Sequence, residues 1–259
     1  MSHTGRSISH FWDTMTTDVE YVLYLDIDGT LAAFKPDPQQ SFIPEKTLYV
    51  LKCLLALGVP VILVTGRCLK EAQRLAQGLD VPIAASHGID IYHKQQLKHP
   101  TIDPNKVKHL QQYVTKACRN IALRLEYKDY SVALHYREYP QSAQACEQIA
   151  KQTVQAFPDF HIKSGQCVWE IAPIQANKGY AIDYLQRVLN FEQHRAIFIG
   201  DDVTDEDGFN MVNRMHGVSI KVGSGLTQAR YRIDDIQACS DFLAQFTKKI
   251  INNRHGSTL

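Results

Sequence analysis

Residues 21–30 read YVLYLDIDGT, an apolar run that ends in two carboxylates one residue apart. The run of Tyr, Val and Leu is typical of a strand buried on both faces of a parallel sheet. Asp26 and Asp28 follow directly where that strand ends. Burying an unpaired carboxylate costs roughly several kcal/mol, so a compensating partner is expected. A metal cation is one candidate, and the capping of a following helix is the simpler alternative.

The composition excludes several classes of protein. The chain has 259 residues, 44% of them hydrophobic and 21% charged, which is the balance of a folded globular protein. Its net charge of +1 provides no field that would attract nucleic acid or a membrane surface. The sequence has neither an apolar stretch of about 18 residues nor a signal peptide. We therefore expect a cytoplasmic protein with no nucleic-acid or membrane partner, and with its six cysteines as free thiols.

The first and last parts of the chain alternate short apolar strands with helices. The predicted strands are Val19–Asp26, Val59–Val64, Val81–Ala85, Ala196–Ile199 and Gly217–Val222. The predicted helices are Lys46–Leu57, Leu69–Gln77, Lys178–Val188 and one near Asp241–Ile250. This alternation predicts a doubly wound α/β fold with a parallel sheet.

The middle of the chain has a different pattern, in the order helix, two strands, helix, two strands. Hairpin-length turns join the paired strands, which predicts a small antiparallel sheet with two helices on one face. We expect residues 93–173 to form this α+β domain, inserted into a core of residues 19–92 and 174–250. An N-terminal segment (1–18) and a C-terminal tail (251–259) complete the predicted division.

A second apolar strand also ends in acids, in the sequence FIGDD. In open α/β sheets, ligands bind at the carboxyl ends of the strands. If the two strands are neighbours, Asp26, Asp28 and Asp201 converge, and such oxygen ligands suit magnesium (Mg²⁺). Two acidic clusters that each follow an apolar strand favour a metal site over helix capping.

These groups can perform phosphoryl transfer. A carboxylate such as Asp26 can attack phosphorus, and Asp28 can protonate the leaving oxygen and later accept a proton from water. The T-G-R of residues 65–67 offers a hydroxyl and backbone N–H groups near a helix start. Lys178 can place a positive charge beside the phosphate and Asp26.

The order of these residues along the chain resembles that of the haloacid dehalogenase (HAD) superfamily. The motifs are D-x-D-x-T at residues 26–30, Thr65, Lys178 and the G-D-D of residues 200–202. The resemblance implies a HAD-like, Rossmannoid parallel-sheet core with an inserted cap of the C2B type, αββαββ. It also implies that Asp26 is the nucleophile, that Asp28 is the acid and base, and that Mg²⁺ binds Asp26, the Asp28 carbonyl and Asp201.

Four further stretches resemble the trehalose-6-phosphate phosphatases. They are GDDVTDED (200–207), SVALHYR (131–137), VWEIAP (168–173) and NKG (177–179). The resemblance implies Mg²⁺-dependent hydrolysis of trehalose 6-phosphate to trehalose and phosphate. Charged side chains on the cap suit a sugar, whose many hydroxyl groups donate and accept hydrogen bonds.

The predicted site combines both resemblances with the chemistry of the residues. The catalytic residues are Asp26, Asp28 and Lys178. The phosphate-binding residues are Thr30, Thr65, Gly66 and Lys178. The substrate-binding residues are Arg67, Lys128, Arg137, Lys163 and Glu170. The metal ligands are Asp26, Asp28 and Asp201, supported by Asp202 and Asp205. No role is assigned to His87 or His135.

Three alternatives remain open at this stage. The chain could be a phosphatase for sucrose phosphate or a mannosyl phosphate, or a phosphomannomutase, which shares the first motif and the cap type. A non-catalytic sensor of the sugar phosphate is the third, although every predicted catalytic position is filled. A monomer that binds a small sugar phosphate is expected.

Overall fold

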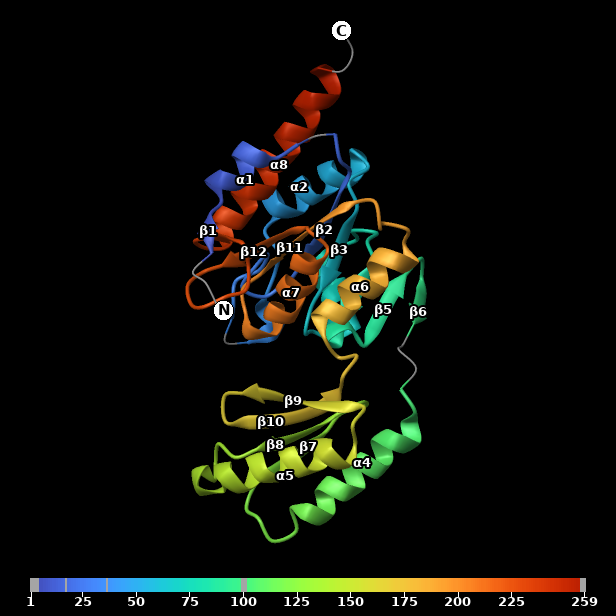
Figure 1. Ribbon diagram of the computed structural model, residues 1–259, viewed down its shortest axis with the longest axis vertical. Helices are drawn as coiled ribbons and strands as arrows, with labels where there is room; N and C mark the ends of the chain where they lie inside the picture. Colours follow the sequence, from blue (N-terminus) through green and yellow to red (C-terminus); the bar gives the residue numbers. More distant parts are fainter. Residues whose placement is uncertain (1–4, 17, 36, 99–101, 257–259) are drawn as a thin grey trace. The chain divides into compact units, whose positions relative to one another are not determined.

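The computed structural model describes residues 5–16, 18–35, 37–98 and 102–256. The chain divides into two compact units, drawn in Figure 1. One comprises Met1–Lys98 with Asn177–Leu259, and the other comprises His99–Ala176.

The first unit is built on a nine-stranded sheet in the order β1-β13-β12-β11-β2-β3-β4-β5-β6. The pairs from β1 to β4 are parallel, whereas β5 and β6 form an antiparallel hairpin at one edge. The strands are β1 (Arg6–Ser7), β2 (Tyr21–Leu25), β3 (Val61–Val64), β4 (Ile83–Ala85), β5 (Asp90–His93), β6 (Gln96–Lys98), β11 (Arg195–Gly200), β12 (Val218–Val222) and β13 (Tyr231–Ile233).

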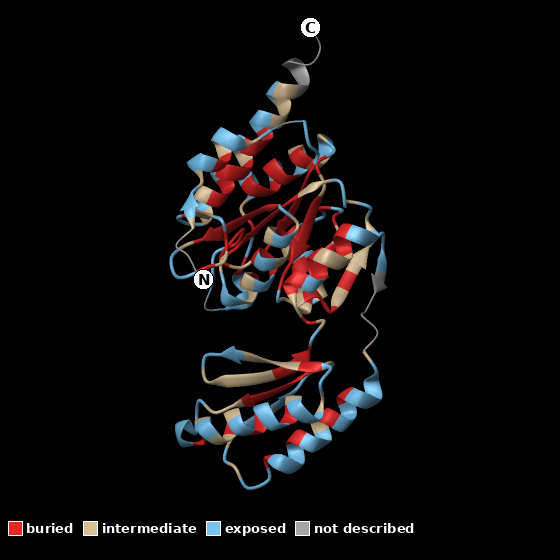
Figure 2. Cartoon of the chain, viewed as in Figure 1, coloured by how far each residue is buried: buried red, intermediate tan, exposed pale blue. Residues whose placement is uncertain are grey.

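Helices pack on both faces of this sheet, so that the strands are buried between two layers (Figure 2). One face packs against α1 (Ser9–Thr14), α2 (Glu45–Ala56), α3 (Leu69–Ala76) and α8 (Ile236–Gly256). The other packs against α6 (Lys178–Val188) and α7 (Glu206–Arg214). Alternate residues of β2 enter the two cores, with Leu23 in the first and Tyr24 in the second. This double burial explains why β2 is a continuous apolar run.

The second unit is an antiparallel sheet in the order β7-β8-β10-β9, with two helices on one face. Its elements are α4 (Pro104–Ala117), β7 (Arg124–Tyr127), β8 (Val132–His135), α5 (Ala143–Ala156), β9 (Phe160–Gly165) and β10 (Val168–Pro173). Val132 and Ile171 pack against Leu110 and Ile149 of the helices. The predicted fold class, a parallel α/β core with an αββαββ insertion, is therefore confirmed.

Both ends of the chain contain helix or strand residues that the sequence analysis did not predict. Within the N-terminal segment predicted for residues 1–18, residues 6–14 form β1 and α1, and Phe11 is buried with its ring 5.5 Å from that of Phe242. The C-terminal tail was expected to begin at residue 251, but α8 continues to Gly256, and residues 257–259 lie outside the described part. Once a helix has nucleated, extending it by one turn requires little free energy.

The core extends further along the chain than predicted at the first boundary. The units divide after Lys98 and Ala176, whereas residues 92 and 173 were expected. Residues 93–98 complete the β5–β6 hairpin, whose turn residues Lys94 and Gln95 have φ values of 49° and 60°. Such left-handed turns normally carry Asn or Gly, so this hairpin had no recognisable turn signal.

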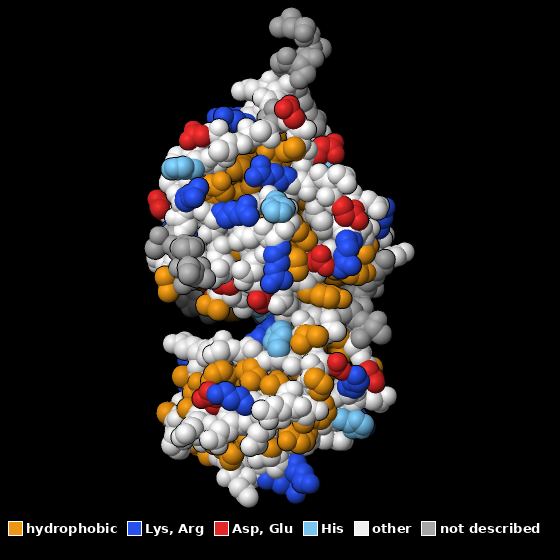
Figure 3. Space-filling model, in the orientation of Figure 1, with side chains coloured by type: hydrophobic (Ala, Val, Ile, Leu, Met, Phe, Trp, Pro, Cys, Tyr) orange, Lys and Arg blue, Asp and Glu red, His pale blue; other side chains and the backbone are white. Residues whose placement is uncertain are grey.

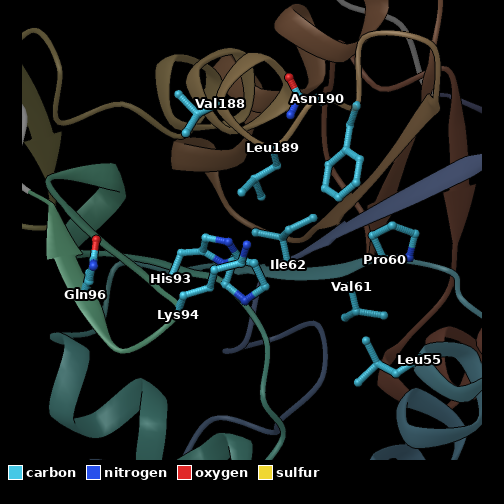
Figure 4. A pocket seen from close by; sticks show the side chains of 12 residues that line it. Leu55, Pro60, Val61, Ile62, His93, Lys94, Gln96, Val188, Leu189 and Asn190 are labelled. Atoms are coloured by element: carbon cyan, nitrogen blue, oxygen red, sulfur yellow. The ribbon is translucent and has the colours of Figure 1, made fainter.

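The first unit has two further surface features. On the face drawn in Figure 3, basic and acidic side chains are interspersed, in agreement with the small net charge. A cavity of about 570 Å³ lies at the start of β3 and the end of α6, and Figure 4 shows Val61, Ile62, Lys94, Val188 and Leu189 among the residues that line it. It adjoins the amino end of β3, whereas the predicted site lies at the carboxyl end.

The helices give no indication of a membrane span. Among the described residues, no helix is both long enough and apolar enough to cross a bilayer.

Candidate active site

The carboxyl ends of β2 and β11 lie side by side. The two strands pair in parallel, with Leu25 opposite Ile199, and the Asp26 N–H donates to the Ile199 carbonyl at 3.0 Å. Asp26 and Asp201 therefore follow adjacent strands at the same edge of the sheet, which is the condition on which the predicted metal site depended.

Three carboxylates gather at this edge, because oxygens of Asp26, Asp201 and Asp205 all lie within 4.8 Å of one another. Both Asp205 oxygens are already engaged. One accepts the N–H groups of Asp201 and Asp202 at 3.0 and 2.9 Å, and the other accepts Lys178 Nζ at 2.7 Å. Asp205 therefore shapes the loop, and Asp202, which is exposed, forms a capping box with it.

Asp201 differs from Asp205 in that one of its oxygens is free to bind a ligand. Within the described part of the chain, Asp201 Oδ1 is buried and accepts no hydrogen bond. Gly29 makes room for this carboxylate, because a Cβ there would lie 2.0 Å from Asp201 Oδ2. A buried carboxylate oxygen with no donor, beside a second carboxylate, fits a divalent cation such as Mg²⁺.

Lys178 is buried at the centre of the cluster and is only 2% exposed. Its Nζ lies 2.9 Å from Asp26 Oδ1 and 2.7 Å from Asp205 Oδ1. The residue opens α6, which begins there because the Asn177 side chain accepts the Tyr180 N–H at 3.0 Å. Local capping therefore fixes the backbone from which Lys178 reaches the carboxylates.

The charges of the cluster shift its pKa values. Burial and the charge of Asp205 raise the pKa of Asp26 well above its usual range, although Lys178 opposes this shift. Burial and the neighbouring acids also raise the pKa of Asp201 to about 6. Burial alone would lower the pKa of Lys178, but the charges of Asp26 and Asp205 outweigh it and raise that pKa. The carboxylates thus repel one another, and a bound cation would relieve this repulsion.

A second buried lysine, Lys221, was not predicted from the sequence. It lies in β12, is 6% exposed, and donates a hydrogen bond to the backbone carbonyl of Asp201. Its charge lowers the pKa of Asp201, against the effect of burial. A lone lysine inside the apolar run VSIKV was the available signal, because a strand buried on both faces rarely contains an unpaired charge.

The T-G-R loop follows β3 at the same edge. Thr65 is 1% exposed, and its Oγ1 accepts the Arg67 N–H at 3.2 Å, whereas Gly66 is exposed. The loop is supported by residues 86–88: the His87 N–H donates to the Thr65 carbonyl at 2.9 Å, and a Cβ on Gly66 would lie 2.6 Å from the His87 ring. The structure thus gives His87 a supporting position beneath this loop.

One of the predicted substrate-binding residues is paired within the protein, and a predicted phosphate-binding residue has an unengaged hydroxyl. Thr30 is completely buried, and its Oγ1 has no hydrogen-bond partner in the described part of the chain. Arg67 was expected to bind substrate, but its guanidinium pairs with both oxygens of Asp28 at 2.6 and 2.7 Å. No local pattern indicated this contact, because the partners are 39 residues apart along the chain.

The second unit holds the remaining predicted residues, of which Lys128 and Glu170 lie together. Glu170 accepts Lys128 Nζ at 3.0 Å and the Ser131 hydroxyl at 2.6 Å. Burial alone would raise the pKa of Glu170, but these two donors outweigh it and lower that pKa, so the side chain is an ionised acceptor. Lys163 lies opposite Glu170 in the register of β9 and β10, whereas Arg137 is exposed beyond β8.

Comparison with solved structures identifies the class of fold. A trehalose-6-phosphate phosphatase from Aspergillus fumigatus aligns with a TM-score of 0.73 and 22% identity, over 90% of this chain and 94% of the other. A haloacid dehalogenase-like hydrolase from Bacteroides thetaiotaomicron aligns with a TM-score of 0.66 and 15% identity, over 88% and 99%. The fold is that of the HAD-like hydrolases.

Sequence comparison then gives the family. The trehalose-phosphatase family profile matches residues 24–237. The Trehalose-6-phosphate phosphatase of Escherichia coli is 33% identical over 250 residues, covering 95% of this chain and 93% of that protein. A probable trehalose-phosphate phosphatase of Sinorhizobium fredii is 36% identical over 217 residues, covering 82% of each. The chain belongs to the trehalose-phosphatase family, which confirms the resemblance seen in its motifs.

Proposed function

We propose that this protein hydrolyses trehalose 6-phosphate to trehalose and phosphate. Family membership supports the substrate, and the geometry around Asp26 supports the chemistry. The observation that carries the proposal is a buried Asp26 carboxylate paired with Lys178 and lying beside Asp201, whose Oδ1 accepts no hydrogen bond in the described part of the chain. This arrangement suits a nucleophile next to a cation site.

We propose Mg²⁺ as the cation, held by carboxylate oxygens of Asp26 and Asp201 and by the backbone carbonyl of Asp28. The unengaged buried oxygen of Asp201 supports this assignment. When bound, Mg²⁺ would neutralise charge on the phosphoryl oxygens and between the carboxylates. Asp202 and Asp205 hold the loop that carries Asp201.

The reaction proceeds in two steps on residues of the first unit. An oxygen of Asp26 forms a bond to phosphorus as the bond from phosphorus to the sugar oxygen breaks, and Asp28 gives that oxygen a proton. Asp28 then takes a proton from water, whose oxygen attacks phosphorus and displaces Asp26. Lys178 keeps Asp26 oriented, while Thr65 and Gly66 bind the phosphoryl oxygens.

We propose that the second unit recognises the sugar. Glu170, oriented by Lys128 and Ser131, is a fixed acceptor for sugar hydroxyl groups, and Arg137 and Lys163 are the additional donors. The protein is proposed to act as a monomer in the cytoplasm. All six cysteines are free, which suits a reducing compartment.

Phosphate release from a panel of sugar phosphates, with and without Mg²⁺, tests the function. We expect trehalose 6-phosphate to be preferred over sucrose 6-phosphate and mannosyl phosphates, and Asp26→Asn to abolish turnover while the circular dichroism spectrum is retained. Undiminished activity of this variant refutes the nucleophile. A requirement for a sugar bisphosphate, with isomerisation in place of phosphate release, identifies a mutase instead.

A further inference from the structure

The proposed acid and base, Asp28, is held by Arg67 through both carboxylate oxygens. Arg67 Nε donates to Oδ2 at 2.6 Å and Nη2 donates to Oδ1 at 2.7 Å, which is the two-pronged geometry of a strong arginine–carboxylate pair. The side chains are 14% and 23% exposed, so the pair is largely shielded from water. Asp28 therefore has one defined orientation in this structure.

Arg67 is itself anchored on its other side. Its Nη1 donates to the Pro38 carbonyl at 3.0 Å and lies 3.6 Å from Glu71 of α3. Pro38 belongs to the short 3-10 helix η1 (Pro38–Gln40), which follows the Asp28 loop in the chain. The guanidinium thus connects three segments, and its direction toward Asp28 is fixed by two further contacts.

The contacts of Arg74 resemble those of Arg67 except at Asp28. Arg74 lies in α3, whereas Arg67 precedes that helix; Arg74 donates to the Ser41 carbonyl at 3.2 Å and pairs with Glu71 at 2.9 Å. Both arginines therefore bind a carbonyl of residues 38–41 and share Glu71. The two arginines differ at Asp28: among the hydrogen bonds and ion pairs of the described residues, Arg67 binds Asp28 and Arg74 does not. Arg74 is thus a matched control within the same chain.

We propose that Arg67 is a positioning residue that acts through Asp28, and not the ligand of the substrate that the sequence suggested. The inference rests on the proposed function. Each Asp28 oxygen accepts one N–H group of Arg67 and keeps a further lone pair, to which a proton can bind. Arg67 therefore holds the carboxyl group in one orientation while Asp28 gives its proton to the sugar oxygen.

This role predicts that the effect of Arg67 depends on the leaving group. A sugar alkoxide is a poor leaving group and needs a proton from Asp28, whereas p-nitrophenolate leaves without one. General acid catalysis contributes about 10²- to 10⁴-fold. Because kcat/KM reports the steps up to departure of the leaving group, Arg67→Met should lower it for trehalose 6-phosphate and largely spare it for p-nitrophenyl phosphate.

The experiment compares four proteins on both substrates: the wild type, Arg67→Met, Arg67→Lys and Arg74→Met. We expect Arg67→Met to lose about 10- to 100-fold in kcat/KM on trehalose 6-phosphate, and less than about threefold on the aryl phosphate. Arg67→Lys, which keeps the charge but not the two-pronged contact, should lie between wild type and Arg67→Met. Arg74→Met should match the wild type on both substrates.

A double-mutant cycle with Asp28→Asn completes the test. Because Arg67 acts through Asp28, Arg67→Met should cause no further loss on trehalose 6-phosphate in the Asp28→Asn background. Equal losses on both substrates, a further loss in that background, or a similar loss in Arg74→Met would each overturn the inference. If Arg67→Met fails to fold by circular dichroism, Arg67→Lys is used in the cycle with the same criteria.

The two proposals fail in different ways. If the wild type prefers another sugar phosphate, the substrate assignment falls, and the comparison is repeated with that substrate against the aryl phosphate. If Asp26→Asn keeps its activity, Asp26 is not the nucleophile, and both the proposed mechanism and the role of Arg67 in it are refuted. A leaving-group effect that is absent in an active, Asp26-dependent enzyme overturns the role of Arg67 alone.

Discussion

Replacing Lys178 with methionine should strongly destabilise the unit that contains the active site. The side chain is 2% exposed and lies within 2.9 Å of Asp26 and 2.7 Å of Asp205. The variant leaves two buried carboxylates without their shared cation, and breaking a buried pair in this way costs about 3–5 kcal/mol. For a chain of this size, that loss lowers Tm by about 6–20 °C.

The assay is thermal and urea unfolding at pH 8 in EDTA, so that no divalent cation replaces the missing charge. The loss in the free energy of unfolding of Lys178→Met should become smaller as the pH falls, because the raised pKa of Asp26 lets that carboxyl group take up a proton and lose its charge. Lys178→Met/Asp205→Asn should recover part of the stability, since one of the two stranded charges is then absent.

The exposed pair between Lys46 and Asp241 provides the control. Its atoms are 3.4 Å apart on a surface where both side chains are more than half exposed, so Lys46→Met should change stability little. If Lys178→Met unfolds at the same urea concentration as the wild type, Lys178 is not compensating buried charge, and the electrostatic account of the site is wrong.

Three further predictions follow from single contacts. Lys221→Met should weaken Mg²⁺ binding about 10- to 100-fold in calorimetry, because the backbone carbonyl of the proposed metal ligand Asp201 loses its hydrogen-bond donor. Tighter Mg²⁺ binding by the variant would instead mean that Lys221 acts only by repelling the cation. Ser131→Ala should raise KM for trehalose 6-phosphate about tenfold with little change in kcat, because Glu170 loses a charge-assisted hydrogen bond, and an unchanged KM would contradict this. Burial and a neighbouring lysine lower the pKa of His161 from 6.5 to about 4. Between these two pH values the unfolded chain binds a proton at His161 and the folded protein does not, so the free energy of unfolding falls as the pH decreases. His161→Gln should flatten that slope in urea unfolding at pH 7 and pH 4.5, and an unaltered slope would assign it to other groups.

The sequence predicted the central strands of the parallel sheet well, and the edge hairpin and the N-terminal elements poorly. The strand before Asp26 was recognisable because double burial requires an unbroken apolar run, and this requirement is local. The β5–β6 hairpin was missed because its turn at Lys94 and Gln95 lacks Asn or Gly. Phe11 could not be assigned to the core, because its partner Phe242 lies more than two hundred residues away.

The sequence by itself determined which residue types stand at the ends of β2, β3 and β11, and therefore that carboxylates and a hydroxyl group lie at one edge of the sheet. Parallel strands bring their carboxyl ends to the same edge, so this much follows from order along the chain. Lys178 opens α6, so its place in this group was predicted by the motif order alone. Only the tertiary structure decided how those groups are paired: Arg67 with Asp28, Lys221 with the Asp201 carbonyl, and Lys178 between two acids. Pairing depends on the directions and reach of side chains from separate elements, and nothing in the local sequence encodes the distance between them.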